Sequence, residues 1–255
     1  MALIGLDIEQ HHNLKLLRQS SFEFAVQFNL VALVANEFAL AALNYPILFV
    51  EGQSGFVPVA LLSLVSDENQ YVQNDQWQAA YVPAGIRTYP FRLAGEHVLI
   101  DDTAPHLSVS EGDALFTDEG QATLTLQNVL AFLRESHAAE EQTKKWCQQL
   151  ASLDLFEKQN VLVTSPEGQR YQLEDFYVIA ADKITLLPDS ELIRLVRDDS
   201  LAKIYAHQGS LEHLLKLAIQ RDKLTTSNPE VLDDETDAFV EIKSTNTAKT
   251  RKTRA

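Results

Sequence analysis

The sequence predicts an α+β protein, in which a first half of mainly antiparallel strands precedes a helix-rich second half. Short apolar segments separated by turn residues fill the first half of the chain, as is typical of hairpins. From about residue 124 the apolar residues recur at helical intervals instead. Strands and helices do not alternate regularly, which argues against a doubly wound parallel sheet.

The first half supplies most of the expected strands. Residues 21–30 alternate in polarity, which predicts a strand with Phe22, Phe24 and Phe28 on one face. A helix is expected at residues 35–43, with Asn36 as a candidate cap and Pro46 preventing its continuation. Further strands are expected at residues 47–50 and 57–65, in a hairpin of residues 69–72 and 77–82, and in a hairpin of residues 91–93 and 97–100.

The second half supplies the helices. Residues 124–151 predict one long helix or two short ones, because Leu126, Leu130 and Leu133 recur at helical spacing. The other expected elements are a hairpin of residues 160–164 and 170–178, a short strand at 184–187, and helices at 190–197 and 200–223.

The chain divides into a globular part and a charged tail. Residues 1–224 are expected to form a single globular domain, since 45% of the 255 residues are apolar. Residues 225–255 mix six acidic and five basic side chains without a repeating apolar stripe. This composition predicts a disordered tail, whose basic end could contact an acidic partner.

Charge and composition exclude several classes of protein. With 21 Lys and Arg against 36 Asp and Glu, the net charge of −15 argues against nucleic acid as a partner. The longest uncharged apolar stretch, residues 38–50, is too short to span a bilayer, so no membrane insertion is expected. The N-terminus does not resemble a secretion signal. We therefore expect a cytoplasmic protein in which Cys147, the single cysteine, is a free thiol.

Motifs of the common catalytic and cofactor sites are absent from the sequence. The histidines show no metal-ligand spacing, and no glycine-rich phosphate loop or nucleophile elbow occurs. Cys147 follows Trp146 in an amphipathic segment, which favours a packing role over a nucleophile. Accordingly, no metal and no cofactor is expected.

Residues 81–91 form an unusual cluster of aromatic residues, prolines and one arginine. A rigid loop that presents Arg87 between Tyr81 and Tyr89 could bind a carboxylate in a bidentate manner. Alternatively, Arg87 pairs with an internal acid, such as Glu37 or Glu68, while the aromatic rings fill the core.

This cluster, Ala-Tyr-Val-Pro-Ala-Gly-Ile-Arg-Thr-Tyr-Pro-Phe, resembles the signature of the bacterial SapC family, named after a surface-array (S-layer) gene cluster. Thr88 stands where that signature usually has a second arginine, which weakens a two-arginine anion clamp. Other segments agree with the family in order and spacing: residues 37–38, 41–42, 45–49, 68–72 with Trp77, 115–116 with Gly120, and 204–207 with 210–211.

The resemblance implies that the protein has an accessory role and does not indicate a particular reaction. It supplies no established catalytic residues. Family members occur in S-layer export clusters, and elsewhere with halogenase-like genes beside TonB-dependent receptors. The resemblance therefore implies a protein that acts with a cell-envelope or peptide-modification system. A structural S-layer component is less favoured, because such a protein is normally exported.

Two functional hypotheses follow. The first is a non-catalytic accessory protein that binds a protein or peptide through the loop and a sheet edge; a homodimer is also compatible with the apolar content. The second is an enzyme acting on a peptide or small molecule, with Glu37, Glu68, Asn69, Arg87 and His207 converging in one pocket. Each of these residues also has a structural interpretation. Glu37 could stabilise the N-terminus of a helix, and Glu68 and Asn69 could be turn residues. Arg87 could pair with an internal acid, and His207 could be a hydrogen-bonded structural histidine of a helix.

Overall fold

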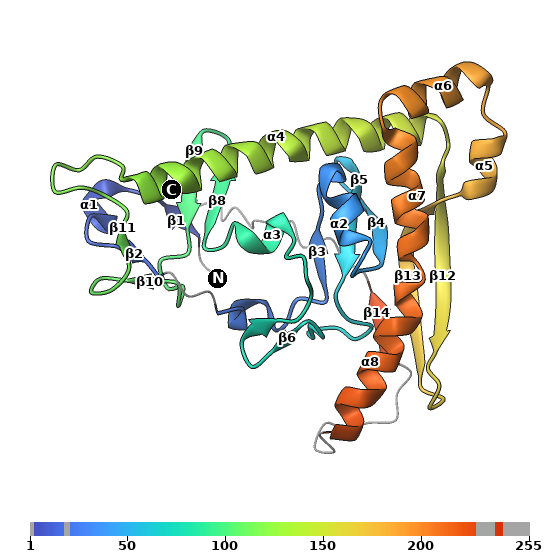
Figure 1. The fold of residues 1–255 in the computed structure, drawn as a ribbon, viewed down its shortest axis with the longest axis horizontal. Coiled ribbons are helices and arrows are strands. Elements are labelled where there is room, and N and C mark those ends of the chain that lie inside the picture. Colours follow the sequence, from blue (N-terminus) through green and yellow to red (C-terminus); the bar gives the residue numbers. More distant parts are fainter. Residues whose placement is uncertain (1–2, 18–20, 228–237, 242–255) are drawn as a thin grey trace, which may run out of the picture.

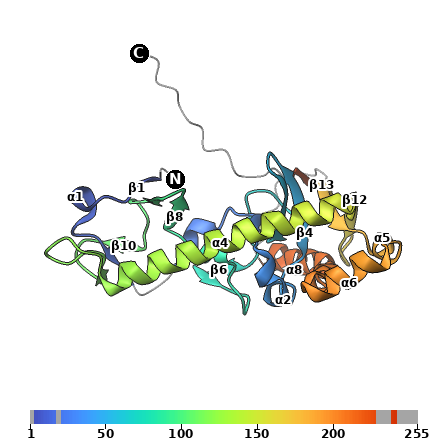
Figure 2. The same cartoon turned by 90° about the horizontal axis from the view of Figure 1, so that it is seen from above.

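The computed structural model describes residues 3–17, 21–227 and 238–241. It confirms the α+β class, with antiparallel sheets in the first half and most of the helical residues in the second. Figures 1 and 2 show an elongated molecule in which one long helix passes over two groups of strands.

The main sheet has six strands, and its principal strands follow the order β12-β13-β4-β5-β3. All of these neighbours are antiparallel, whereas the short strand β14 runs parallel to β13. The strands are β3 (Leu30–Ala32), β4 (Ile47–Gly52), β5 (Gly55–Leu61), β12 (Phe156–Thr164), β13 (Arg170–Ile179) and β14 (Ala238–Glu241).

The opposite end of the molecule contains smaller sheets. One is three-stranded, in the order β1-β9-β8, and another has the order β10-β2-β11. Their elements, with the short helix between them, are β1 (Ile4–Gly5), α1 (Ile8–His11), β2 (Lys15–Leu16), β8 (Phe91–Ala94), β9 (His97–Ile100), β10 (Leu107–Ser108) and β11 (Asp113–Ala114).

Helix α4 (Leu124–Ser152) connects the two ends. Thr123 caps it by accepting a hydrogen bond from the Leu126 amide at 3.4 Å. Near its start, Leu126 and Leu133 join a small core with Phe91 and Ile100. Near its end, the side chains of Trp146, Cys147 and Leu150 join the large core of the main sheet. Of the two expected alternatives, one long helix or two short ones, the structure contains the single long helix, and this helix contributes to two hydrophobic cores.

Among the described residues, four helices follow β13, and the last two contact strands of the main sheet. They are α5 (Ala181–Thr185), α6 (Asp189–Arg197), α7 (Ser200–Ser210) and α8 (His213–Ser227). The strand expected at residues 184–187 is wrong, because this segment belongs mostly to α5 and the turn after it. The single helix expected at residues 200–223 is divided. Ser210 at the end of α7 binds the backbone of β4, whereas His213 at the start of α8 binds the Ala42 carbonyl.

Two expectations for residues 21–43 are also wrong in detail. The strand expected at residues 21–30 is a 3-10 turn, η1 (Glu23–Ala25), followed by β3. The helix expected at residues 35–43 is shorter, and consists of η2 (Ala35–Glu37) and α2 (Phe38–Ala41). Asn36 is not its cap: Val34 is the cap residue, and its amide donates to Glu37 Oε2 at 3.0 Å.

The predicted hairpins are present with shifted boundaries. β6 (Val72–Gln73) and β7 (Gln76–Trp77) form a shorter hairpin than expected, in which Asn74 and Asp75 have φ of 49° and 60°. Two positive φ values are typical of a tight two-residue hairpin turn. β5 ends at Leu61, before the expected residue 65, and β12 begins at Phe156, before the expected residue 160.

The tail expected to be disordered contributes β14, which pairs with β13. The other residues of the segment 228–255 lie outside the described residues.

Candidate functional site

The loop of residues 81–91 contains a short helix, α3 (Ala84–Arg87), which begins after Pro83. Gly85 allows this helix to approach β3 closely. A Cβ atom at Gly85 would lie 2.9 Å from Val31 Cγ2 and 3.2 Å from the Ala32 carbonyl oxygen. The main sheet therefore holds α3, and α3 fixes the position from which Arg87 projects.

Glu37, Tyr81 and Arg87 form one hydrogen-bonded cluster. Glu37 is 5% exposed. Its Oε1 accepts hydrogen bonds from the Tyr81 hydroxyl and from the Ala84 amide, the latter at 2.7 Å. The Tyr81 hydroxyl in turn accepts a hydrogen bond from Arg87 Nη2 at 3.4 Å. The buried carboxylate thus holds both the loop and the phenol, and burial is the main reason why the pKa of Tyr81 rises to about 12.

Arg87 is the exposed member of this cluster. Its Nε donates to the Val82 carbonyl at 3.0 Å. Its guanidinium carbon lies 4.9 Å from the ring centroid of Phe132 and 5.8 Å from that of Tyr81, within the range of cation–π contacts. Within the described parts of the chain, no carboxylate forms a salt bridge with Arg87. The expected alternative, a direct ion pair with Glu37 or Glu68, is therefore not what this structure contains.

Tyr89 does not flank Arg87 as the sequence suggested. Its ring stacks on Phe24 with centroids 3.9 Å apart. Its hydroxyl donates to Oδ2 of the buried Asp101 at 3.2 Å. Burial and this carboxylate raise the pKa of Tyr89 to about 12. Phe132 of α4 takes the place expected for Tyr89, and no local pattern around residues 81–91 indicates that contact.

A group of aromatic side chains on the core side of the loop holds the backbone of Tyr81 in place. The hydroxyl of the buried Tyr45 donates to the Tyr81 carbonyl and accepts from Trp77 Nε1 at 2.8 Å. Tyr71 packs against Tyr45 and donates from its hydroxyl to the Asn44 carbonyl at 2.8 Å. Burial raises the pKa of Tyr45 well above its ordinary value. The Tyr45 hydroxyl therefore serves as a hydrogen-bond donor that positions the loop, and Tyr71 supports Tyr45 by packing.

Glu68 and Asn69 lie apart from this cluster. Glu68 accepts from the Ser63 hydroxyl at 3.0 Å and forms an ion pair with Arg221 of α8. The buried Asn69 donates from Nδ2 to the Ala25 carbonyl at 3.0 Å and accepts from the Tyr71 amide at 2.9 Å. Both side chains connect the β6–β7 hairpin to neighbouring segments.

His207 lies in the large core and is fully buried. Its Nδ1 is 2.8 Å from the Ile47 carbonyl oxygen, and its Nε2 is 3.0 Å from the Ile179 amide. These partners require a neutral ring that donates from Nδ1 and accepts at Nε2. Burial lowers the pKa of His207 to about 4, which agrees with that assignment. His207 thus connects the backbones of β4 and β13.

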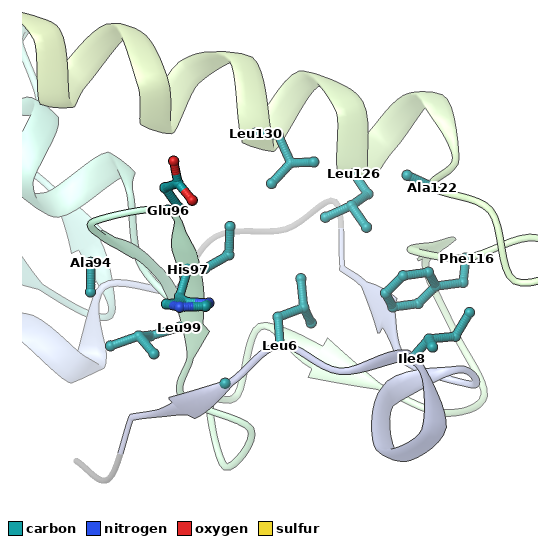
Figure 3. Close-up of a pocket in the computed structure, with 12 residues that line it drawn as sticks. Leu6, Ile8, Ala94, Glu96, His97, Leu99, Phe116, Ala122, Leu126 and Leu130 are labelled. Atoms are coloured by element: carbon teal, nitrogen blue, oxygen red, sulfur yellow. The ribbon is translucent and has the colours of Figure 1, made fainter.

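The five side chains expected to converge in an enzyme pocket have separate partners. Glu37 and Arg87 share the Tyr81 hydroxyl, whereas Glu68, Asn69 and His207 bind other segments. A cavity of about 610 Å³ lies between α4 and β9, at the small core. Figure 3 shows Leu126 and Leu130 of α4 pointing toward Leu6 and Phe116 across this cavity. None of the candidate residues Glu37, Glu68, Asn69, Tyr81, Arg87, Tyr89 and His207 lines it.

The described residues contain no group of three or more His, Cys, Asp and Glu side chains arranged to hold a metal ion. Cys147 is buried, and burial raises the pKa of its thiol to about 12. Among the helices that the structure describes, none combines the length and apolarity needed to cross a membrane.

The geometry defines an α+β protein with two hydrophobic cores and an exposed arginine, whose partner Tyr81 is hydrogen-bonded to a buried carboxylate. The family model described as SapC matches residues 6–217, which is most of the chain, and the protein therefore belongs to the SapC family. No curated protein and no solved structure matches the chain.

Proposed function

We propose that this protein is a non-catalytic accessory protein that binds a protein or peptide partner, and that Arg87 is the centre of recognition. One observation supports this most directly. Among the candidate polar side chains, Glu37, Glu68, Asn69 and His207 all have internal partners, whereas Arg87 is exposed and without a carboxylate partner among the described residues.

The setting of Arg87 favours a carboxylate of the partner as its ligand. The Val82 carbonyl holds Nε, and the rings of Phe132 and Tyr81 flank the guanidinium. A guanidinium whose orientation is fixed loses less rotamer entropy on forming a bidentate pair. The half-buried aromatic rings beside the exposed guanidinium also match the composition of binding hot spots, which are enriched in arginine and aromatic residues.

Family membership supports the biological setting that we propose, a cell-envelope or peptide-modification system. S-layer clusters and TonB-dependent receptors are the contexts that the resemblance implies. A cytoplasmic location and a homodimer remain parts of this proposal. The −15 net charge supports a partner other than nucleic acid.

The test is co-purification of the full chain with the products of its neighbouring genes, followed by mass spectrometry of the intact complex. We expect stoichiometric capture of a protein or peptide by the wild type and loss of capture in Arg87→Ala. Arg197→Ala, an exposed arginine of α6, is the matched control and should retain the partner. Capture of a small metabolite that is equally bound by both variants would contradict the proposal and favour the enzyme hypothesis.

A further inference from the structure

Strand β13 has two edges with different partners. One edge pairs with β12 from Arg170 to Ile179. The other pairs with β4 at a single position, Tyr177 opposite Phe49. β14 pairs with β13 over Tyr171–Glu174. Because a strand has only two edges and β12 occupies one of them, β14 must lie on the edge that β4 leaves.

A bulge explains why β4 leaves β13. Asp175 has a φ of 58°, and the pairing of β12 with β13 shifts register between Gln159 and Val161. The Asp175 carboxylate also pairs with Lys158 Nζ at 2.6 Å. A β-bulge bends its strand and ends regular pairing. Figure 1 shows the β12–β13 hairpin continuing beyond β4 and β5.

The part of β13 beyond the bulge is firmly supported on one face. Tyr171 and Leu173 are buried in the large core, together with Leu217 and Ala218 of α8. Helix α8 contacts β12 along the same hairpin. Packing therefore fixes this segment of β13, and its edge opposite β12 presents backbone groups that can pair with another strand. Such unpaired strand edges bind other extended chains.

The segment that fills this edge is short and peripheral. β14 contains four residues and runs parallel to β13, and parallel pairing is slightly less stable per residue than antiparallel pairing. It also lies outside the region 6–217 that matches the family. The edge thus belongs to the family fold, while its occupant comes from the additional C-terminal segment.

We propose that the β13 edge at Tyr171–Glu174 is a strand-addition site for an extended peptide, and that the chain's own Ala238–Glu241 blocks it until such a partner displaces it. The existence of a peptide partner rests on the function proposed above. Main-chain hydrogen bonds supply the affinity in this mode of recognition, and alternate side chains supply the specificity.

The register defines the chemistry of the peptide. Ala238 and Val240 stand opposite Tyr171 and Leu173. A competing peptide should therefore have small or branched apolar residues at two alternate positions, and no proline between them, because proline cannot donate to the ladder.

The test uses the full chain and a labelled peptide with the sequence of residues 236–243. The variant carries Phe239→Pro and Val240→Pro, because successive amides of a strand point to opposite edges and one of these two must face β13. The control carries Thr245→Pro and Asn246→Pro, which lie beyond the paired segment. Fluorescence anisotropy measures peptide binding, and amide exchange by NMR measures protection of Tyr171–Glu174.

We expect the peptide to bind the Phe239/Val240 variant on the order of tenfold more tightly than the wild type or the control, because the competing segment no longer occupies the edge. The added peptide should restore amide protection in that variant. Equal binding to all three proteins, or no binding to the variant, would overturn the proposal. The proposal would also be overturned if the wild type is a dimer and the Phe239/Val240 variant is a monomer, because the edge of β13 would then pair with a second copy of the chain.

One further measurement does not depend on the folding of the variant. If Tyr171–Glu174 amides that face away from β12 exchange rapidly in the wild type, the segment Ala238–Glu241 does not block the edge. The peptide used here is part of the chain's own sequence, so this experiment does not involve Arg87. A negative result would overturn the strand-addition site without affecting the proposed role of Arg87, and a negative result for Arg87→Ala would not change the outcome of this experiment.

Discussion

The role of His207 as a connector of two strands leads to a quantitative prediction for His207→Gln. The substitution removes the ring that satisfies both the Ile47 carbonyl and the Ile179 amide. A glutamine can replace one of these hydrogen bonds more readily than both. Each buried polar group left without a partner costs about 1–3 kcal/mol, so we expect a loss of roughly that amount at pH 7.

The pH dependence separates His207 from a general packing defect. Its pKa is about 4 in the folded protein against 6.5 as the ordinary value. The stability that comes from the neutral ring is therefore fully present above about pH 6.5 and is lost progressively as the pH falls toward 4. With these values, lowering the pH from 7 to 5 should cost the wild type about 2 kcal/mol through this residue.

The assay is urea unfolding of the wild type and His207→Gln at pH 7 and pH 5. The variant lacks this titration, so the stability difference between the two proteins should shrink by about 2 kcal/mol at pH 5. His137→Gln, a half-exposed histidine of α4, is the control for the same chemical change. A difference between the wild type and His207→Gln that is the same at both pH values would refute the reasoning.

Other side chains give further expectations. Glu37→Gln should lower the unfolding free energy by about 1–3 kcal/mol. The two oxygens of Glu37 accept hydrogen bonds from the Tyr81 hydroxyl, the Val34 amide and the Ala84 amide, and glutamine replaces one of these oxygens with an NH2 group that cannot accept. A melting temperature equal to that of the wild type would contradict this prediction. Cys147 should resist a thiol reagent in the native state at pH 8, since it is buried and its pKa is about 12; reaction as fast as in urea would disprove its burial.

The sequence predicted the fold class and the elements that local patterns specify. Apolar residues at helical spacing predicted one long helix or two short ones where α4 lies. The hairpin β8–β9 was predicted from its Ala94-Gly95 turn, and Gly95 has a φ of 61° in the structure. The strand expected at residues 21–30 failed because Phe22, Phe24 and Phe28 fill the aromatic core from a loop. There the tertiary packing outweighs the alternating pattern.

The candidate site was predicted only in part. The sequence indicated a loop at residues 81–91 that presents Arg87, and Arg87 is exposed in the structure. Glu37, named as a possible direct partner of Arg87, is instead linked to it through the Tyr81 hydroxyl. The bridging role of the Tyr81 hydroxyl and the contact with Phe132 depend on how α4 crosses the loop. A single sequence holds no signal for contacts between segments so far apart. Likewise, the spacing of His207 and Ser210 becomes meaningful only when both are seen to bind the backbone of Ile47.

The most direct test of the central claim is the affinity of the captured partner for the wild type, Arg87→Ala and Arg197→Ala, measured by titration calorimetry at one salt concentration. A fixed, exposed guanidinium that pairs with a partner carboxylate predicts at least a tenfold weaker binding for Arg87→Ala, equivalent to about 1.4 kcal/mol. Arg197→Ala should bind like the wild type. Equal affinities for all three proteins would contradict the assignment of recognition to Arg87.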